Sequence, residues 1–148
     1  MQDETIDHFM QVRAVLEATR GLLSDTLLAL YLHGSAVSAG LRPHSDIDLL
    51  AIIDGPMTDA QRRSLLFALL KISGHYPAPP NGPRCIELIV FQKTNLTLLG
   101  APPRAEFIYG EWLRNAFESG ELPQPVTDPD LVLVLAQAAK IKRPTARP

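Results

Sequence analysis

The sequence predicts an α/β domain, because apolar strand-like runs alternate with stretches of helical periodicity. The runs span residues 27–32, 46–53 and 85–91. They are rich in branched aliphatic residues and have turn signals around them, as is typical of strands buried on both faces. A length of 148 residues, of which 46% are hydrophobic and 20% charged, fits one domain with an ordinary core.

The bulk composition excludes several classes of function. A net charge of -2 leaves no basic footprint for a nucleic-acid backbone. The single cysteine, Cys85, rules out an internal disulfide and a thiolate zinc cluster, and it suits a reducing compartment. The N-terminus lacks the features of a signal peptide, and no apolar run approaches the roughly 20 residues of a membrane span. We therefore expect a soluble cytoplasmic protein without nucleic-acid or membrane partners.

Two helices are expected around the first strands. Apolar residues recur at helical spacing over residues 3–20, and Gly21 would end that helix. Thr58 followed three residues later by Gln61 has the spacing of a capping box, which predicts the start of the second helix. Gly74 stands where a C-terminal glycine would end it.

The later part of the chain is expected to contain shorter elements. A short strand is predicted over residues 106–109 and a short helix over residues 111–119. A last helix is predicted over residues 129–141, and its apolar positions are spread more widely than one core-facing stripe. Such a helix expects a second packing partner, which would be either a further part of a longer chain or a second copy of this chain. We therefore assign residues 1–128 to the core of the domain and residues 129–148 to a terminal helix and tail.

The main indication of function is that carboxylates occur in apolar strands that are predicted to be buried. Asp46 and Asp48 alternate at the start of one strand, so both point to one face, about 6.6 Å apart along the chain. Glu87 is the one charge in another apolar run. If these strands are neighbours, the three carboxylates converge and raise one another's pKa values unless a cation neutralises them. Oxygen ligands favour Mg²⁺ or Mn²⁺, and such a cluster suits two ions about 3.5–4 Å apart, the spacing used in phosphoryl transfer.

A Gly-Ser pair directly follows the first strand. Gly34 lets the backbone approach a phosphate closely, and a short turn there offers free N–H groups. The hydroxyl group of Ser35 can donate a hydrogen bond to a phosphate oxygen. Each feature alone is weak evidence for a phosphate or metal site. The combination of a strand, a Gly-Ser turn, paired aspartates and a later lone glutamate is far more specific.

Two segments carry a resemblance to a known family. They are residues 30–37, LYLHGSAV, and residues 40–50, GLRPHSDIDLL. Both closely resemble the aminoglycoside adenylyltransferases that modify streptomycin and spectinomycin, within the nucleotidyltransferase superfamily typified by DNA polymerase beta. Further matches at Glu87, at residues 110–115 and around Asp130 extend the resemblance over nearly the whole chain.

The resemblance implies a fold, a reaction and catalytic residues. The fold would be a mixed β-sheet flanked by helices. The reaction would transfer AMP from ATP to a drug hydroxyl with the help of two Mg²⁺ ions, and would release pyrophosphate. Asp46 and Asp48 would bind metal, and Glu87 would both contribute to the metal site and act as general base.

The resemblance also implies binding residues and a further domain. Gly34 and Ser35 would hold the triphosphate, with help from Ser45, and Trp112 would contact streptomycin. The family carries a C-terminal helical domain of roughly another hundred residues, and residues 129–148 would form the junction to it.

Other interpretations stay open at the level of sequence. A minimal nucleotidyltransferase could transfer AMP to a protein hydroxyl instead of a drug, and a non-catalytic nucleotide-binding module would need no acceptor. Individual residues also have structural alternatives. Glu87 could form a salt bridge with Arg84 or Arg42, and Trp112 could be a packed core residue.

Overall fold

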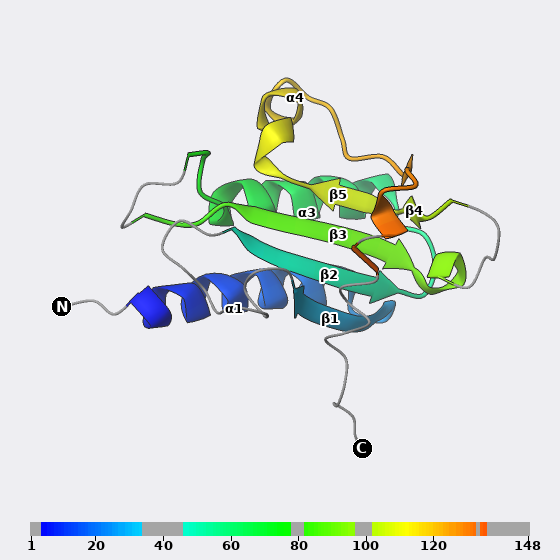
Figure 1. The fold of residues 1–148 in the computed structure, drawn as a ribbon, viewed down its shortest axis with the longest axis horizontal. Helices are drawn as coiled ribbons and strands as arrows, with labels where there is room; N and C mark the ends of the chain where they lie inside the picture. Colours follow the sequence, from blue (N-terminus) through cyan, green and yellow to red (C-terminus); the bar gives the residue numbers. More distant parts are fainter. Residues whose placement is uncertain (1–3, 34–45, 78–81, 97–101, 133, 136–148) are drawn as a thin grey trace, which may run out of the picture.

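The fold is built around a mixed β-sheet with helices on one face (Figure 1). The computed structural model describes residues 4–33, 46–77, 82–96, 102–132, 134 and 135. The elements are, in chain order, α1 (Glu4–Leu23), β1 (Leu27–His33), β2 (Ile47–Ile53), α3 (Asp59–Ile72), β3 (Ile86–Gln92), the 3₁₀ helix η1 (Lys93–Leu96), β4 (Arg104–Ala105), β5 (Phe107–Tyr109), the 3₁₀ helix η2 (Glu111–Leu113), α4 (Arg114–Glu118) and β6 (Val126–Thr127).

The described strands form a four-stranded sheet in the order β1-β2-β3-β5 and a two-stranded sheet of β4 and β6. In the larger sheet, β1 is antiparallel to β2, β2 is parallel to β3, and β3 is antiparallel to β5. The parallel pair is connected through α3, since parallel neighbours need a crossover. The expectation of a mixed sheet flanked by helices is therefore confirmed.

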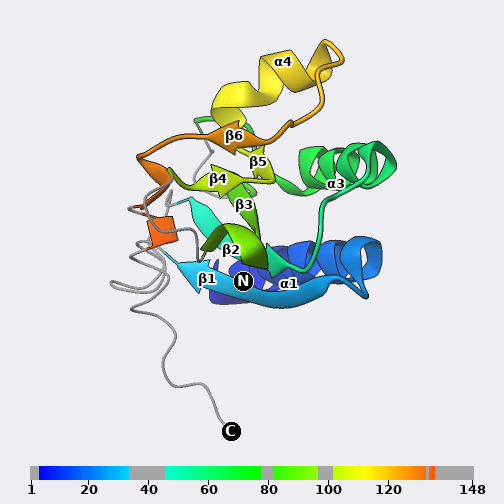
Figure 2. The same ribbon diagram turned by 90° about the vertical axis from the view of Figure 1, so that its right-hand side faces the viewer.

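The main hydrophobic core lies between the sheet and the two long helices. Figure 2 shows α1 and α3 side by side against one face of the sheet. The core side chains of the two central strands alternate along each strand; they are Ile47, Leu49, Ala51, Ile53, Ile86, Leu88 and Val90. Val15 from α1 and Leu65 and Leu69 from α3 pack against them. This alternation directs the intervening residues of β2 and β3 to the opposite face.

The opposite face of the sheet carries a smaller core and the predicted site residues. Leu50, Ile89 and Phe91 are buried there, and Leu131 packs on them from the C-terminal part of the described chain. Asp48 and Glu87 have the same strand parity as these residues, so they belong to this face. Residues 136–148 of the predicted last helix and tail lie outside the described residues.

The helix boundaries follow the sequence signals in part. The capping box of α3 is confirmed, because Gln61 N donates to Thr58 Oγ1 at 3.1 Å and Thr58 N donates to Gln61 Oε1 at 2.8 Å. The predicted end of α1 at Gly21 is wrong, because the helix continues to Leu23, which is fully buried in the core. Burial of that last turn outweighs the cost of about 1 kcal/mol for a glycine inside a helix.

Gly74 serves a close backbone approach rather than a left-handed helix cap. Ser73 caps α3, and the N–H of Gly74 donates to Arg84 O at 2.8 Å. A Cβ atom at this position would lie 2.0 Å from Pro83 O. The end of α3 is thereby held against the segment that leads into β3.

The shorter elements lie close to their predicted positions. The strand predicted from residue 106 begins at Phe107, and Glu106 lies in a bend between β4 and β5. The helix predicted over residues 111–119 is η2 followed by α4, and Gly120 ends it with a φ of 108°. None of the helices in the described part of the chain combines the length and apolarity needed to cross a membrane.

Candidate active site

Three carboxylates come together at the end of the sheet where the central strands β2 and β3 begin. Asp48 and Glu87 are register partners on these two parallel strands, so the predicted neighbourhood of the two strands is confirmed. Asp46 directly precedes β2. The ends of β1 and β5 meet the same edge, because His33 pairs with Asp48 and Tyr109 pairs with the residue after Glu87.

The three carboxylates repel one another. Burial raises the pKa of Glu87 to about 7, assisted by the charge of Asp48, by a hydrogen bond with Asp48 and by the charge of Asp46. The pKa of Asp46 is also raised, by partial burial and then by the charges of Asp48 and Glu111. Glu87 is therefore poised to gain or lose a proton near neutral pH.

The donor set suits a hard divalent cation but does not by itself complete a metal site. Carboxylate oxygens are the ligands that Mg²⁺ prefers, and a cation would relieve the repulsion that raises the pKa of Glu87. Among the described residues, no group of three or more His, Cys, Asp or Glu side chains is arranged to hold a metal ion. An ion bound here would therefore draw further ligands from phosphate oxygens or water, as Mg²⁺ commonly does.

A pocket of about 450 Å³ adjoins the carboxylates. Its lining is mainly charged, aromatic and polar, with one aliphatic side chain; the residues are Asp46, His75, Tyr76, Cys85, Ile86, Glu87, Glu111, Trp112, Arg114 and Asn115. The volume is within the range of about 300–1,000 Å³ that is usual for small-molecule sites. Tyr76 and Trp112 are 78% and 66% exposed, so two large aromatic side chains are available at this pocket.

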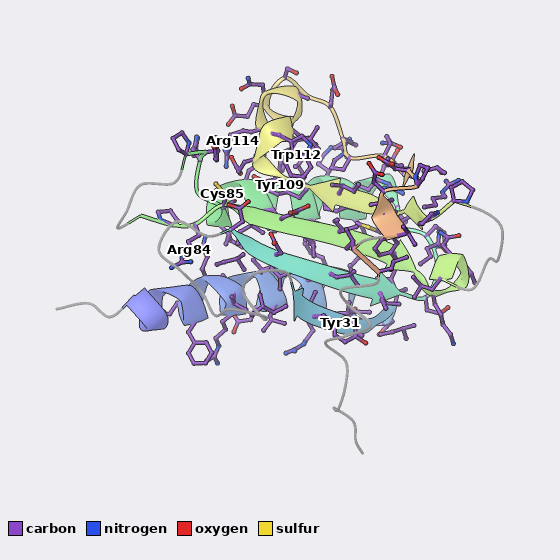
Figure 3. All side chains as sticks on the ribbon, viewed as in Figure 1. Tyr31, Arg84, Cys85, Tyr109, Trp112 and Arg114 are labelled. Atoms are coloured by element: carbon purple, nitrogen blue, oxygen red, sulfur yellow. The ribbon has the colours of Figure 1, made fainter. Side chains whose placement is uncertain are left out.

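One wall of the pocket is held by a buried ion pair. Glu111 Oε1 accepts from Arg114 Nε at 2.6 Å, and Glu111 Oε2 accepts from Arg114 Nη2 at 3.0 Å, from Tyr109 OH at 2.6 Å and from Ser73 Oγ at 2.8 Å. Burial acts to raise the pKa of Glu111, but hydrogen bonds from Arg114, Tyr109 and Ser73 outweigh it and lower the pKa. We call Ser73, Tyr109, Glu111 and Arg114 the Glu111 cluster. Figure 3 shows Tyr109, Trp112 and Arg114 near Cys85, at the end of the sheet where β3 begins.

The indole ring of Trp112 lies over Gly110. A Cβ atom on Gly110 would lie 2.0 Å from Cζ3 and 2.3 Å from Cη2 of Trp112. Gly110 has extended backbone geometry with a φ of -159°, so the glycine is required by this close approach and not by its backbone conformation. The interpretation of Trp112 as a packed core residue is wrong, because its side chain is mostly exposed.

The structure brings together some of the predicted site residues and adds others. Gly34, Ser35 and Ser45 lie outside the described residues. The predictions for Asp46, Asp48, Glu87 and Trp112 concern roles, and these roles remain predictions. Sequence reasoning did not identify the following pocket and cluster residues: Ser73, His75, Tyr76, Tyr109 and Arg114. Two signals pointed to Arg114: its three-residue spacing from Glu111, since such pairs meet on a helix surface, and its place in the matching segment 110–115.

Comparison with known proteins identifies relatives that are named as antibiotic adenylyltransferases. The chain is 39% identical over 130 residues to a spectinomycin 9-adenylyltransferase of Campylobacter jejuni, a match that covers 88% of this chain and 50% of that protein. It is 34% identical over 128 residues to an aminoglycoside (3'') (9) adenylyltransferase of Klebsiella pneumoniae, covering 86% and 48%. No family model matches the chain.

A solved structure supports the same relationship. The crystal structure of a spectinomycin adenylyltransferase from Enterococcus faecalis, determined with ATP and spectinomycin, superposes with a TM-score of 0.84 at 35% identity. The match covers 89% of this chain and 53% of the other. The chain thus spans about half the length of the relatives that it matches.

Proposed function

Because this chain belongs with the spectinomycin and aminoglycoside adenylyltransferases, sharing their sequence and fold over about half of their length, we propose that it provides the catalytic half of such an enzyme. The reaction is transfer of AMP from ATP to a hydroxyl group of spectinomycin or streptomycin, with release of pyrophosphate. The acceptor is an antibiotic rather than a protein, since the relatives are named for antibiotics. A reaction that consumes ATP also agrees with a cytoplasmic location.

The observation that carries this proposal is the pairing of Asp48 with Glu87 on adjacent parallel strands, beside a pocket of small-molecule size. Burial, and then the charge of Asp48 at the register position opposite, raise the pKa of Glu87. A purely structural sheet gains nothing from this arrangement, whereas a metal-dependent phosphoryl-transfer site uses it.

Asp46 and Asp48 are the residues that we propose to hold Mg²⁺, with Glu87 beside them. When bound, Mg²⁺ supplies positive charge to the phosphates of ATP. The two-ion arrangement requires ligands from the nucleotide in addition to these side chains. Gly34, Ser35 and Ser45 remain predicted contacts of the triphosphate, on the basis of their positions in the sequence.

Glu87 is the proposed general base for the acceptor hydroxyl. Burial raises its pKa to about 7 in the metal-free protein, and a carboxylate with a raised pKa accepts a proton more effectively. Glu87 also lines the pocket that contains the exposed aromatic side chains of Tyr76 and Trp112. A hydroxyl group bound in this pocket would therefore lie on the same side of the sheet as its base.

The proposal is tested most directly with Asp48→Asn. The variant keeps the shape of the side chain and removes its charge, so AMP transfer should fall by at least about 10³-fold while the fold is retained. The measurement is pyrophosphate release from ATP and Mg²⁺ with spectinomycin, and separately with streptomycin. Mass spectrometry of the drug should show the added AMP.

The matched control is Asp54→Asn, at the other end of the same strand, where the side chain is exposed. It should keep wild-type activity. Full activity of Asp48→Asn would refute the mechanism. A wild-type chain that binds ATP and Mg²⁺ in calorimetry but forms no AMP adduct on either drug would refute the proposed acceptor class.

A further inference from the structure

The Glu111 cluster connects three elements that surround the pocket. Through Tyr109 it is tied to the end of β5, and through Ser73 it is tied to the C-terminal end of α3. Ser73 Oγ also accepts from Ile86 N at 2.9 Å, at the first residue of β3 and next to Glu87. The carboxylate of Glu111 therefore lies at a junction that fixes the wall of the pocket relative to the proposed base.

Arg114 completes this junction by capping the helix that precedes the pocket. Its Nη2 atom donates to Leu70 O at 3.3 Å and to Ser73 O at 3.4 Å, which are carbonyl groups in the last turn and at the cap of α3. The side chains of Arg114 and Glu111 are only 10% and 5% exposed. A buried pair of this kind is strongly coupled, because loss of either partner leaves a buried charge without compensation.

The position of the Trp112 side chain depends on this junction, because Trp112 directly follows Glu111 in the chain. Its backbone belongs to η2, which begins at Glu111, and its indole ring lies over Gly110. The ring is mostly exposed, so few packing contacts hold it from the outside. Its position is set by the backbone on both sides of Glu111.

We propose that Glu111 is a positioning residue for the acceptor: its buried carboxylate fixes the indole ring of Trp112 at the pocket that contains Glu87. The inference rests on the proposed function for the identity of the acceptor. It assigns to Glu111 no contact with the reacting atoms. The charge of Glu111 also contributes to the raised pKa of Asp46, so the positioning effect is isolated by Gly110→Ala, which keeps this carboxylate.

The position of Trp112 can be measured without any ligand. Trp112 is the single tryptophan of the chain, so its intrinsic fluorescence reports on this site alone. Glu111→Gln removes the charge that Arg114 pairs with, and Gly110→Ala displaces the indole ring while leaving the ion pair in place. Both variants should shift the emission maximum of Trp112 and change its quenching by acrylamide.

Matched controls separate this effect from general changes in the protein. Glu121→Gln removes an exposed carboxylate in the following segment, and Gly21→Ala adds a methyl group where nothing lies within 4 Å. Both should leave the fluorescence at wild-type values. Circular dichroism verifies that each variant is folded, and Gly110→Ala keeps the test valid if Glu111→Gln is too unstable to study.

Ligand binding then tests the link to the acceptor. Streptomycin, the drug that Trp112 is expected to contact, should bind about tenfold more weakly to Glu111→Gln and to Gly110→Ala, a loss similar to that of one hydrogen bond to a charged group. The affinity of Gly110→Ala for ATP with Mg²⁺, measured by calorimetry, should be unchanged, because this variant keeps the charge of Glu111 beside Asp46. An equal loss of ATP affinity in Gly110→Ala would show a general structural effect and would overturn the inference.

The remaining outcomes also decide between the two proposals. Wild-type fluorescence and wild-type streptomycin affinity in both variants would overturn the positioning role. A wild-type chain that binds ATP but neither spectinomycin nor streptomycin would overturn the acceptor role of the Glu111 cluster. A wild-type chain that binds no ATP would instead contradict the proposed function, while the fluorescence would still decide whether Glu111 positions Trp112.

Discussion

The two ends of the central sheet hold buried carboxylates in opposite ways. Where β3 ends, Glu106 is almost completely buried and pairs with Arg62, while its oxygens also accept from Met57 N at 2.9 Å and from Gln92 Nε2 at 2.9 Å. Where β3 begins, Glu87 faces Asp48 across the strand pair and has a raised pKa. One carboxylate is surrounded by donors and the other by further carboxylates.

This difference separates a structural charge from a functional one. Glu106 holds elements together, because Arg62 also donates to the carbonyl groups of Glu106 and Pro123. Within the described part of the chain Glu87 forms no ion pair, and its environment makes the ionised form less stable. A fold that keeps such repulsion has a use for it, and a bound cation with a nucleotide is the use that we propose.

The largest effect on stability is expected from removing Arg62, the ion-pair partner of the buried Glu106. Arg62→Ala leaves the carboxylate of Glu106 buried without its ion-pair partner, so the free energy of unfolding should fall by about 3–5 kcal/mol. Urea denaturation measures this loss. Arg63→Ala, an exposed neighbour on the same helix, should change stability by less than about 0.5 kcal/mol. A similar small change for both variants would mean that the pair does not hold this end together.

Substitution of Glu87, at the other end of the sheet, should instead stabilise the protein. Glu87 has an ordinary pKa of 4.5 and a pKa of about 7 in the folded protein. Between these values the folded protein binds more protons than the unfolded chain, so stability falls as the pH rises through this window. Glu87→Gln stays neutral and removes that fall. Above pH 7, and without metal, the variant should be more stable than wild type by about 1–2 kcal/mol, after allowance for solvent screening.

The measurement is the free energy of unfolding in urea at several pH values with a chelator present. Below about pH 4.5 the two proteins should have the same stability, because Glu87 is then protonated in both the folded and the unfolded state. Glu121→Gln, at an exposed site, should give a curve parallel to wild type. Parallel curves for Glu87→Gln as well would contradict the repulsion that we infer at this end.

Much of the fold was predictable because local signals and burial agree. The capping box at Thr58 and the apolar runs of β2 and β3 both depend on a few neighbouring residues, and the structure retains them. Gly21 was misleading because local propensity favours ending the helix there, whereas burial of Leu23 depends on contacts far along the chain. Gly74 does follow the end of α3 as predicted, but the reason for a glycine there, its close approach to Pro83, was not visible in the local pattern.

The candidate site was predictable only to the extent that its residues stand out from their strands. Asp48 and Glu87 are charges within apolar runs, so their positions were visible in the sequence. Ser73 and Tyr76 have no such contrast, because they follow α3 in a segment that resembles any other connection. Their importance comes from the return of β5 and η2 to the same edge of the sheet, which no local pattern encodes.

The smallest change in stability is expected from substitution of Asp46. Its comparison with Glu87 tests whether burial determines how strongly the carboxylates destabilise the fold. Asp46 is more exposed than Glu87, and its pKa is raised by partial burial and by the charges of Asp48 and Glu111. Asp46→Asn should therefore stabilise the metal-free protein in the same direction as Glu87→Gln, but by less than about 1 kcal/mol, because solvent screens the charge. The same urea measurements detect it, with Asp54→Asn as the exposed control directly after β2.

The combination of both substitutions makes this comparison quantitative. The charge of Asp46 contributes to the raised pKa of Glu87, so the two stabilising effects should not add. In the double variant the gain should be smaller than the sum of the single gains, because removal of either charge already relieves part of the shared repulsion. Strict additivity would show that the two carboxylates do not interact, and an effect of Asp46→Asn as large as that of Glu87→Gln would show that burial is not what distinguishes them.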